Sequence, residues 1–254
     1  MTMRLMEALD FRRGDMAALI GAGGKTTTMY HLAKELRDDG GKIMVTTTTK
    51  IIKPTRPHID RLFLVQDVES LSDACATIAA PVIIGAGASV NGEGKLLGLP
   101  PPWLDQLNEG KTLDAILVEA DGAASRGFKV PAEFEPVIPA QTRLAVWLMA
   151  VTVLDKPFDA TWVHRADRAT VLLGRKITGP ITSDLVIELV NHPAGCWRGV
   201  PSASRKIAIV NQADDAEAFA AAELLAEKIL GCGMERVLIT SYTGDEPVKK
   251  VLLQ

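Results

Sequence analysis

The chain has 254 residues, of which 47% are hydrophobic and 23% are charged. These proportions exclude an intrinsically disordered chain, because they provide enough apolar surface for a sizeable core. The formal net charge of -3 argues against a protein whose main task is to neutralise nucleic-acid phosphates, since such domains usually carry a high positive charge. We therefore expect a single globular domain over residues 1–254 that has no nucleic acid among its partners.

Cysteine usage and hydropathy indicate the compartment. Cys75, Cys196 and Cys232 are odd in number and far apart, which fits neither a disulfide framework nor a zinc site. No apolar run approaches the roughly 20 residues that a membrane-spanning helix needs, and charged residues interrupt the start of the chain, where a signal peptide would lie. The sequence thus predicts a cytoplasmic protein with reduced thiols and without a membrane partner.

Short apolar runs alternate with longer amphipathic ones, which is typical of a mostly parallel β-sheet flanked by helices on both faces. The apolar runs predict strands at 16–20, 42–46, 61–65, 82–84, 115–118, 144–148, 206–210 and 237–240. The amphipathic runs predict helices at 26–38, 68–79, 164–173, 181–189 and 215–230. Glycine and proline are concentrated in 85–102, so we expect 85–112 to form a loop or hairpin insertion.

A glycine-rich loop joins the first predicted strand to the first predicted helix. It consists of Gly21, Ala22, Gly23, Gly24, Lys25, Thr26 and Thr27. Glycines allow positive φ angles and let backbone N–H groups approach an anion, and the helix N-terminus adds partial positive charge. In this pattern, G-x-x-G-K-T, Lys25 would reach the β- and γ-phosphates and the Thr26 hydroxyl would bind Mg²⁺.

This loop predicts a P-loop NTPase-like α/β fold that binds GTP or ATP with Mg²⁺. The match departs from the long form of the pattern, G-x-x-x-x-G-K-[ST], because Leu19 stands where that form has its first glycine. The alternative is a glycine-rich turn whose Lys25 is a solvated surface charge.

Thr46, Thr47, Thr48, Thr49 and Lys50 close the second predicted strand, and strand ends at this edge face the nucleotide in open α/β sheets. We expect at least one hydroxyl to contact Mg²⁺ or the γ-phosphate, and we include Thr48 among the nucleotide-binding candidates. The alternative is that threonine is simply abundant in strands.

Acidic residues follow the strand predicted at 115–118. Glu119 and Asp121 are two positions apart, so in an extended chain they point to the same side and can converge on one Mg²⁺. We assign both to the metal and to catalysis, with Glu119 as the residue that could instead polarise water. Arg126 follows, and it could stabilise charge on a transferred phosphate. The alternatives are a turn-capping acid and an ordinary exposed arginine.

A possible base-reading segment follows the strand predicted at 206–210. Asn211, Gln212 and Asp214 resemble the N-K-x-D segment of GTP-binding proteins, in which Asp accepts hydrogen bonds from guanine and Asn braces neighbouring loops. Gln212 replaces the lysine, and Asn and Asp also cap helices, so a structural role is the alternative. Ser241, after the last predicted strand, lies where such folds place a small-residue loop against the base.

Several segments together resemble the YqeC family, which is named as accessory to selenium-dependent molybdenum hydroxylases. They are 21–28, 46–50, 118–123, 128–131, 135–139 and 211–214, in the same order. The short phosphate loop and acidic strand end are also similar to those of P-loop proteins such as metal-insertion GTPases and Mur ligases. The resemblance implies a role in maturing a selenium- and molybdenum-containing enzyme, with that hydroxylase or its cofactor-assembly proteins as partners.

Three functions remain open at this point. The first is a nucleotide-dependent maturation factor that hydrolyses GTP or ATP slowly. The second is a small-molecule kinase or ligase that activates a cofactor precursor. The third is a non-hydrolysing scaffold that is stabilised by bound nucleotide.

Overall fold

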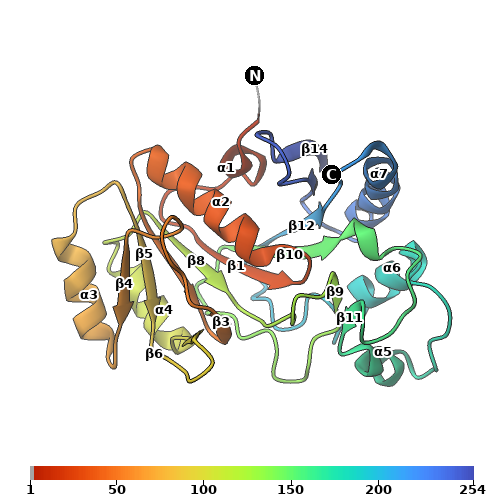
Figure 1. Cartoon of the computed structure of the whole chain (residues 1–254), viewed down its shortest axis with the longest axis horizontal. Helices are drawn as coiled ribbons and strands as arrows, with labels where there is room; N and C mark the ends of the chain where they lie inside the picture. The colour runs from red at the N-terminus through yellow and green to blue at the C-terminus, as the bar shows by residue number, and fades with distance from the viewer. Residues whose placement is uncertain (1–2) are drawn as a thin grey trace.

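Nine strands form the central sheet of the computed structural model, which describes residues 3–254 (Figure 1). Their order is β14-β13-β12-β10-β1-β8-β2-β5-β4, and only β14 runs antiparallel to its neighbour. The strands are β1 (Met16–Gly21), β2 (Lys42–Thr47), β4 (Arg61–Leu64), β5 (Val82–Gly87), β8 (Ala115–Glu119), β10 (Leu144–Ala150), β12 (Arg205–Asn211), β13 (Arg236–Thr240) and β14 (Val248–Leu253).

The eight parallel strands confirm the eight predicted strands. The central strands are rich in apolar residues because helices cover both faces of the sheet. Met16, Ala18 and Ile20 pack into the core on one face, while Ala17 and Leu19 pack into the core on the other. An α/β fold with a mostly parallel sheet is therefore confirmed.

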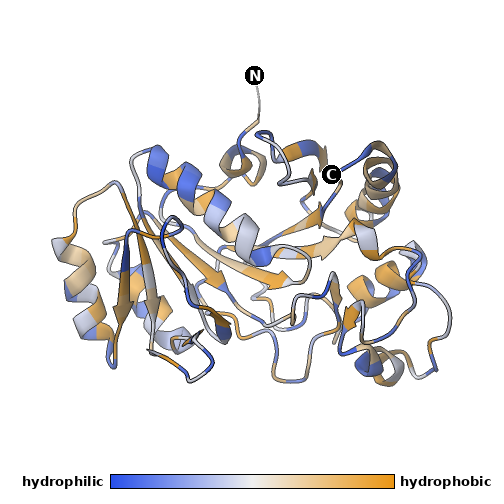
Figure 2. Cartoon of the chain, in the orientation of Figure 1, coloured by the Kyte–Doolittle hydropathy of each residue, from blue (hydrophilic) through white to orange (hydrophobic). Residues whose placement is uncertain are grey.

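Helices lie on both faces of this sheet. One face is covered by α1 (Leu5–Ala8) and α2 (Lys25–Asp38). The other is covered by α3 (Val68–Thr77), α4 (Pro101–Glu109), α5 (Ala166–Leu173), α6 (Ser183–Asn191) and α7 (Ala216–Leu230). Hydrophobic colouring follows the central strands, and the outward sides of the helices are more polar (Figure 2). Among residues 3–254, no helix has the length and apolar character needed to cross a membrane.

The segment 85–112 contains the expected hairpin and, in addition, a helix that was not predicted. It contains the end of β5, then the hairpin of β6 (Ser89–Val90) and β7 (Lys95–Leu97), and then α4. Helix α4 was missed because its prolines looked like helix breakers. They occupy the first helical positions instead, where a missing N–H costs no intrahelical bond.

Two small sheets border the main one at the carboxyl ends of its strands. In the first, β3 (Lys50–Ile52) pairs with β7. In the second, β9 (Phe128–Lys129) pairs with β11 (Val163–His164). A short 3-10 helix, η1 (Val151–Val153), follows β10. These elements rise on either side of the end of β1 and so enclose the edge where the predicted site residues lie (Figure 1).

Candidate functional site

The loop after β1 is shaped by its glycines. Gly21, Gly23 and Gly24 have φ angles of 90°, 73° and 129°, which disfavour any residue with a Cβ. A Cβ on Gly24 would also overlap the side-chain amide of Asn211. Helix α2 begins directly afterwards at Lys25, and no side chain caps its N-terminus. The first N–H groups of α2 therefore face outward without a partner inside the helix.

The first three amides of the loop already have partners. The Gly21 N–H donates to Asp121 Oδ2 at 3.0 Å. The N–H groups of Ala22 and Gly23 donate to the carbonyl oxygens of Leu148 at 2.9 Å and Arg126 at 3.1 Å. An anion would therefore meet the amides of the first turn of α2 rather than a ring of amides from the whole loop.

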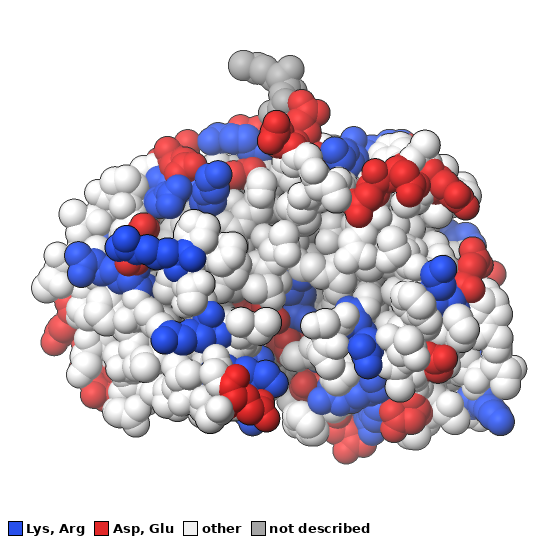
Figure 3. All heavy atoms as spheres, in the orientation of Figure 1, with Lys and Arg blue, Asp and Glu red and all other residues white. Residues whose placement is uncertain are grey.

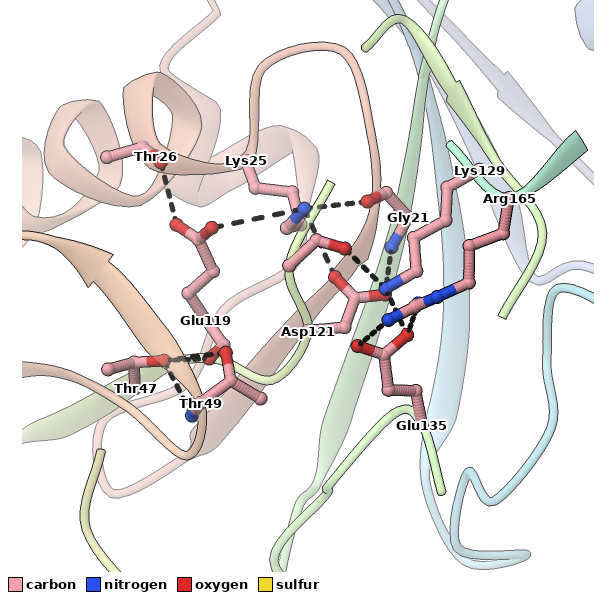
Figure 4. Close-up of polar contacts among 11 residues, drawn as sticks. Gly21, Lys25, Thr26, Thr47, Thr49, Glu119, Asp121, Lys129, Glu135 and Arg165 are labelled. Atoms are coloured by element: carbon pink, nitrogen blue, oxygen red, sulfur yellow. Dashed lines mark hydrogen bonds and ion pairs between the residues drawn. The ribbon is translucent and has the colours of Figure 1, made fainter. Parts of the chain in front are cut away.

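Lys25 lies at the meeting point of the loop and the two predicted acids (Figure 4). Its side chain is only 3% exposed, and Nζ donates to the Gly21 carbonyl oxygen at 2.6 Å. Nζ also lies 3.1 Å from Asp121 Oδ1 and 3.9 Å from Glu119 Oε1. The Thr26 hydroxyl donates to Glu119 Oε2 at 2.7 Å. The structure thus brings together the lysine, the hydroxyl and both carboxylates.

The network continues beyond the loop and its two acids through Lys129, Glu135 and Arg165. Lys129, from β9, has a side chain that is 1% exposed, and Nζ lies 3.1 Å from Asp121 Oδ2 and 2.7 Å from Glu135 Oε2. Arg165 closes the chain by pairing with Glu135. Three carboxylates and three cations therefore alternate from Glu119 to Arg165 and balance each other, as buried charges require. The sequence offered Glu135 only as part of a family resemblance.

The surroundings shift the pKa values of Glu119 and Glu135 in opposite directions. Burial raises the pKa of Glu119, although Lys25 and the Thr26 hydroxyl oppose this effect. Burial alone would also raise the pKa of Glu135, but hydrogen bonds from Lys129 and Arg165 outweigh it and lower the pKa. Of the two, Glu119 is the carboxylate that most needs a cation.

The threonine hydroxyls at the end of β2 donate hydrogen bonds mainly to backbone carbonyl oxygens. The Thr46 and Thr47 hydroxyls donate to the carbonyl oxygens of Ala86 and Glu119, at 2.8 Å and 2.7 Å. The Thr48 hydroxyl donates to the Val137 carbonyl oxygen at 2.6 Å, so the structure does not direct it into the cavity beside the loop.

The predicted base-reading segment contacts the loop from the end of β12, and Gln212 lines the cavity beside the loop. Asn211 donates from Nδ2 to the Gly23 carbonyl oxygen at 2.7 Å and accepts at Oδ1 from Thr240 at 2.8 Å. Ser241 donates to Asp214 Oδ1 at 2.5 Å. The cap of α7 is the next residue, Asp215, whose side chain accepts from the Ala218 N–H at 2.8 Å. Asn211 and Asp214 are therefore not helix caps.

A cavity of about 770 Å³ opens beside the loop residues Gly23 to Thr27. Glu119 lies at its wall, and the cationic side chains around it belong to Lys50, Lys95, Arg126 and Arg165. Arg126 is held by its Nε, which donates to the Ala160 carbonyl oxygen at 2.8 Å. In the space-filling view this face is hollowed near its middle, with both signs of charge at the hollow (Figure 3).

The oxygens around the loop fit Mg²⁺ only with help from a ligand. No group of three or more His, Cys, Asp or Glu side chains is gathered for a metal within residues 3–254. Mg²⁺ commonly binds one or two protein oxygens and completes its shell with phosphate oxygens and water. The Thr26 hydroxyl and the Glu119 carboxylate fit that pattern.

The fold and the site define an α/β protein with a Gly-Lys-Thr loop and two carboxylates at the carboxyl edge of a mostly parallel sheet. A family model described as YqeC protein matches residues 17–167. Uncharacterized protein YqeC of Escherichia coli (strain K12) is 30% identical over 215 residues, which cover 84% of this chain and 82% of that protein. The chain therefore belongs to the YqeC family.

Proposed function

We propose that the protein is a P-loop NTPase that binds GTP or ATP with Mg²⁺ at the loop after β1. The main support is the arrangement of Lys25, Thr26 and Glu119 at the uncapped N-terminus of α2. A terminal phosphate placed there would meet the first-turn amides and the positive end of the helix dipole. Lys25 would then exchange its contact with Asp121 for phosphate oxygens.

Mg²⁺ would neutralise negative charge on the β- and γ-phosphates. The residues that would hold it are Thr26 and Glu119, with Asp121 behind them. The raised pKa of Glu119 is consistent with this assignment, because a cation at the carboxylate would offset the cost of burying its charge. Arg126 lines the same cavity and would face the transferred phosphate.

The base would lie towards Asp214 and Ser241, with Asn211 as the brace between the loops. The contacts of Asn211 with Gly23 and Thr240 support this part of the proposal. A carboxylate at Asp214 suits guanine, whose Watson–Crick edge offers two adjacent donors.

The family resemblance extends the proposal to a cellular role. Slow hydrolysis would accompany maturation of a selenium-dependent molybdenum hydroxylase, and that enzyme or its cofactor-assembly proteins would be the partners. A second candidate, phosphoryl transfer to a small anionic acceptor, is supported by the cationic side chains of Lys50, Lys95 and Arg165 around the cavity.

A thermal-shift panel with ATP, GTP, ADP and GDP, with and without Mg²⁺, tests nucleotide binding. A ligand at about 100 times its Kd adds about 2.7 kcal/mol to the free energy of unfolding. We expect this gain in the wild type, its loss in Lys25→Met, and loss of only its Mg²⁺-dependent part in Thr26→Val. Lys176→Met, at an exposed position, is the matched control and should keep the full gain.

The same samples distinguish the candidate functions. Release of inorganic phosphate supports an NTPase, and transfer of phosphate to a compound supports a kinase. Stabilisation without either reaction leaves only the scaffold. If none of the four nucleotides stabilises the wild type, the proposal is wrong.

A further inference from the structure

A second cavity, of about 690 Å³, adjoins the first along α2. Thr26, Thr27 and Ile52 line both cavities, so the two meet at the first turn of the helix. One wall of the second cavity is α2, and the other is the segment 53–58 between β3 and β4.

The walls of this cavity are basic. The side chains of Lys34, Arg37, Lys53, His31 and His58 line it, and none of the lining residues that the structure describes is Asp or Glu. Arg37 and His31 have acidic neighbours, Asp38 and Glu35, outside the lining. Over the half of the molecule on which α2 lies, Lys and Arg side chains gather on the visible face (Figure 3).

Two of these cations are not neutralised. Lys34 on α2 and Lys53 on the facing segment have no ion-pair partner in the part of the chain that the structure describes. Two like charges on opposite walls repel each other unless an anion lies between them. The cavity is therefore electrostatically suited to a negatively charged group.

An aromatic surface lies beside these cations. The rings of Tyr30 and His58 stack with their centroids 4.4 Å apart and an interplanar angle of 14°. The Tyr30 hydroxyl is buried and has no hydrogen-bond partner within residues 3–254. A flat ring can stack on the exposed face of such a pair.

We propose that this cavity binds a second ligand, a small organic anion with a planar ring and a phosphate or carboxylate group, at the same time as the nucleotide. The base of a nucleotide is neutral, so it would leave Lys34 and Lys53 unpaired, and its triphosphate belongs at Lys25. The position of this ligand beside a terminal phosphate rests on the proposed function. The binding of the ligand in this cavity is independent of the proposed function.

The probe for the test is 4-methylumbelliferyl phosphate, which has a planar ring and a phosphate but is not a nucleotide. Isothermal titration calorimetry should show binding to the wild type, both alone and with saturating Mg²⁺ and nucleotide. The double variant Lys34→Gln, Lys53→Gln should bind at least about tenfold more weakly, because each lost charged hydrogen bond weakens binding by about that factor. Both lysines are exposed, so the fold should tolerate the change.

Controls separate this site from the nucleotide site. Lys25→Met should bind the probe normally even though it loses nucleotide, and Lys176→Gln should not differ from the wild type. His58→Ala and the uncharged ring compound 4-methylumbelliferone should both show weaker binding. Absence of probe binding to the wild type, unchanged affinity in the double variant, or displacement of the probe by nucleotide would each overturn the proposal.

Discussion

Asn211 and Gly23 lie 188 residues apart in the sequence, and the Asn211 Nδ2 donates to the Gly23 carbonyl oxygen at 2.7 Å. The Oδ1 atom of the same side chain accepts from the Thr240 hydroxyl. Only a side chain that donates and accepts at once can make both bonds. A single amide therefore ties the loop after β1 to the end of β13, two strands beyond the neighbour of β1.

Asn211→Ala should lower the free energy of unfolding by about 1–3 kcal/mol, because it leaves the Gly23 carbonyl and the Thr240 hydroxyl without partners. Urea unfolding followed by circular dichroism measures the loss. Asn191→Ala, at an exposed position in α6, should change stability by no more than about 0.5 kcal/mol. Equal losses in the two variants would contradict the bracing role.

Gly21→Ala and Gly40→Ala separate the conformational cost of a positive φ from the cost of crowding. The two glycines have φ angles of 90° and 88°. A Cβ at position 40 meets no atom within 4 Å, whereas at position 21 it would lie 2.8 Å from Trp147 Cδ1 and would overlap the Leu148 carbonyl oxygen. Gly40→Ala should cost about 1–2 kcal/mol of unfolding free energy, and Gly21→Ala about 1–3 kcal/mol more.

Calorimetric melting of these two variants measures the difference. If Gly21→Ala loses no more stability than Gly40→Ala, the inference that the loop packs closely against β10 is wrong. Loss of nucleotide binding in Gly21→Ala alone would further support the loop as the phosphate site.

Glu135→Gln tests the buried charge network through pH. The pKa of Glu135 is lowered from its ordinary value of 4.5, so the unfolded chain holds the proton more tightly than the folded chain. The carboxylate thus stabilises the fold above that ordinary value, and its contribution is lost as pH falls through the lower, folded-state pKa. Glu135→Gln should be less stable than the wild type at about pH 7 and should lose less stability between about pH 5 and pH 3.

Urea unfolding across that range provides the measurement. Glu133→Gln is a suitable control, because Glu133 is 75% exposed although it also pairs with an arginine, Arg168. Parallel pH curves for Glu135→Gln and the wild type would show that the network does not hold Glu135 ionised.

Asp214→Asn tests base recognition. The Asp214 carboxylate is exposed and already accepts from Ser241. An amide in its place would oppose guanine but suit xanthine, so the preference should move by about tenfold from GTP to XTP. Titration calorimetry with ATP, GTP and XTP measures it, and Asp215→Asn, which retains a helix-capping side chain, should keep the original preference. Equal binding of ATP and GTP by the wild type would eliminate Asp214 as the guanine reader.

Apart from the edge strand β4, the parallel strands could be predicted from the sequence because they are buried on both faces and read as continuous apolar runs. β14 could not, because Lys249 and Lys250 interrupt its apolar pattern at the exposed edge of the sheet. β3, β9 and β11 were missed, and β6 and β7 were expected only as a loop or hairpin, because two or three residues carry no periodic pattern. Helix α4 was missed because proline at a helix start resembles proline that ends a helix.

The pairing of Lys25 and Thr26 with Glu119 and Asp121 followed from topology, since the carboxyl ends of β1 and β8 are neighbours. The partners of Lys129 could not be predicted from the strand order in this way. It lies on a two-residue strand, and its contact with Glu135 depends on how the segment after β8 folds back. Thr48 looked equivalent to its neighbours in sequence, and only the position of Val137 shows where its hydroxyl is used.

Trp147, in β10, lies against Gly21 at the end of β1 and is 1% exposed. The rings of Phe128 and Trp197 surround it, with centroids 6.3 Å and 6.2 Å away. An intrinsic fluorophore therefore sits directly beneath the loop, in a rigid apolar environment to which its emission is sensitive. Rapid-mixing fluorescence can follow movement of the loop in real time without an attached dye, and the difference between the wild type and Trp147→Phe isolates the signal of Trp147 from that of the other three tryptophans.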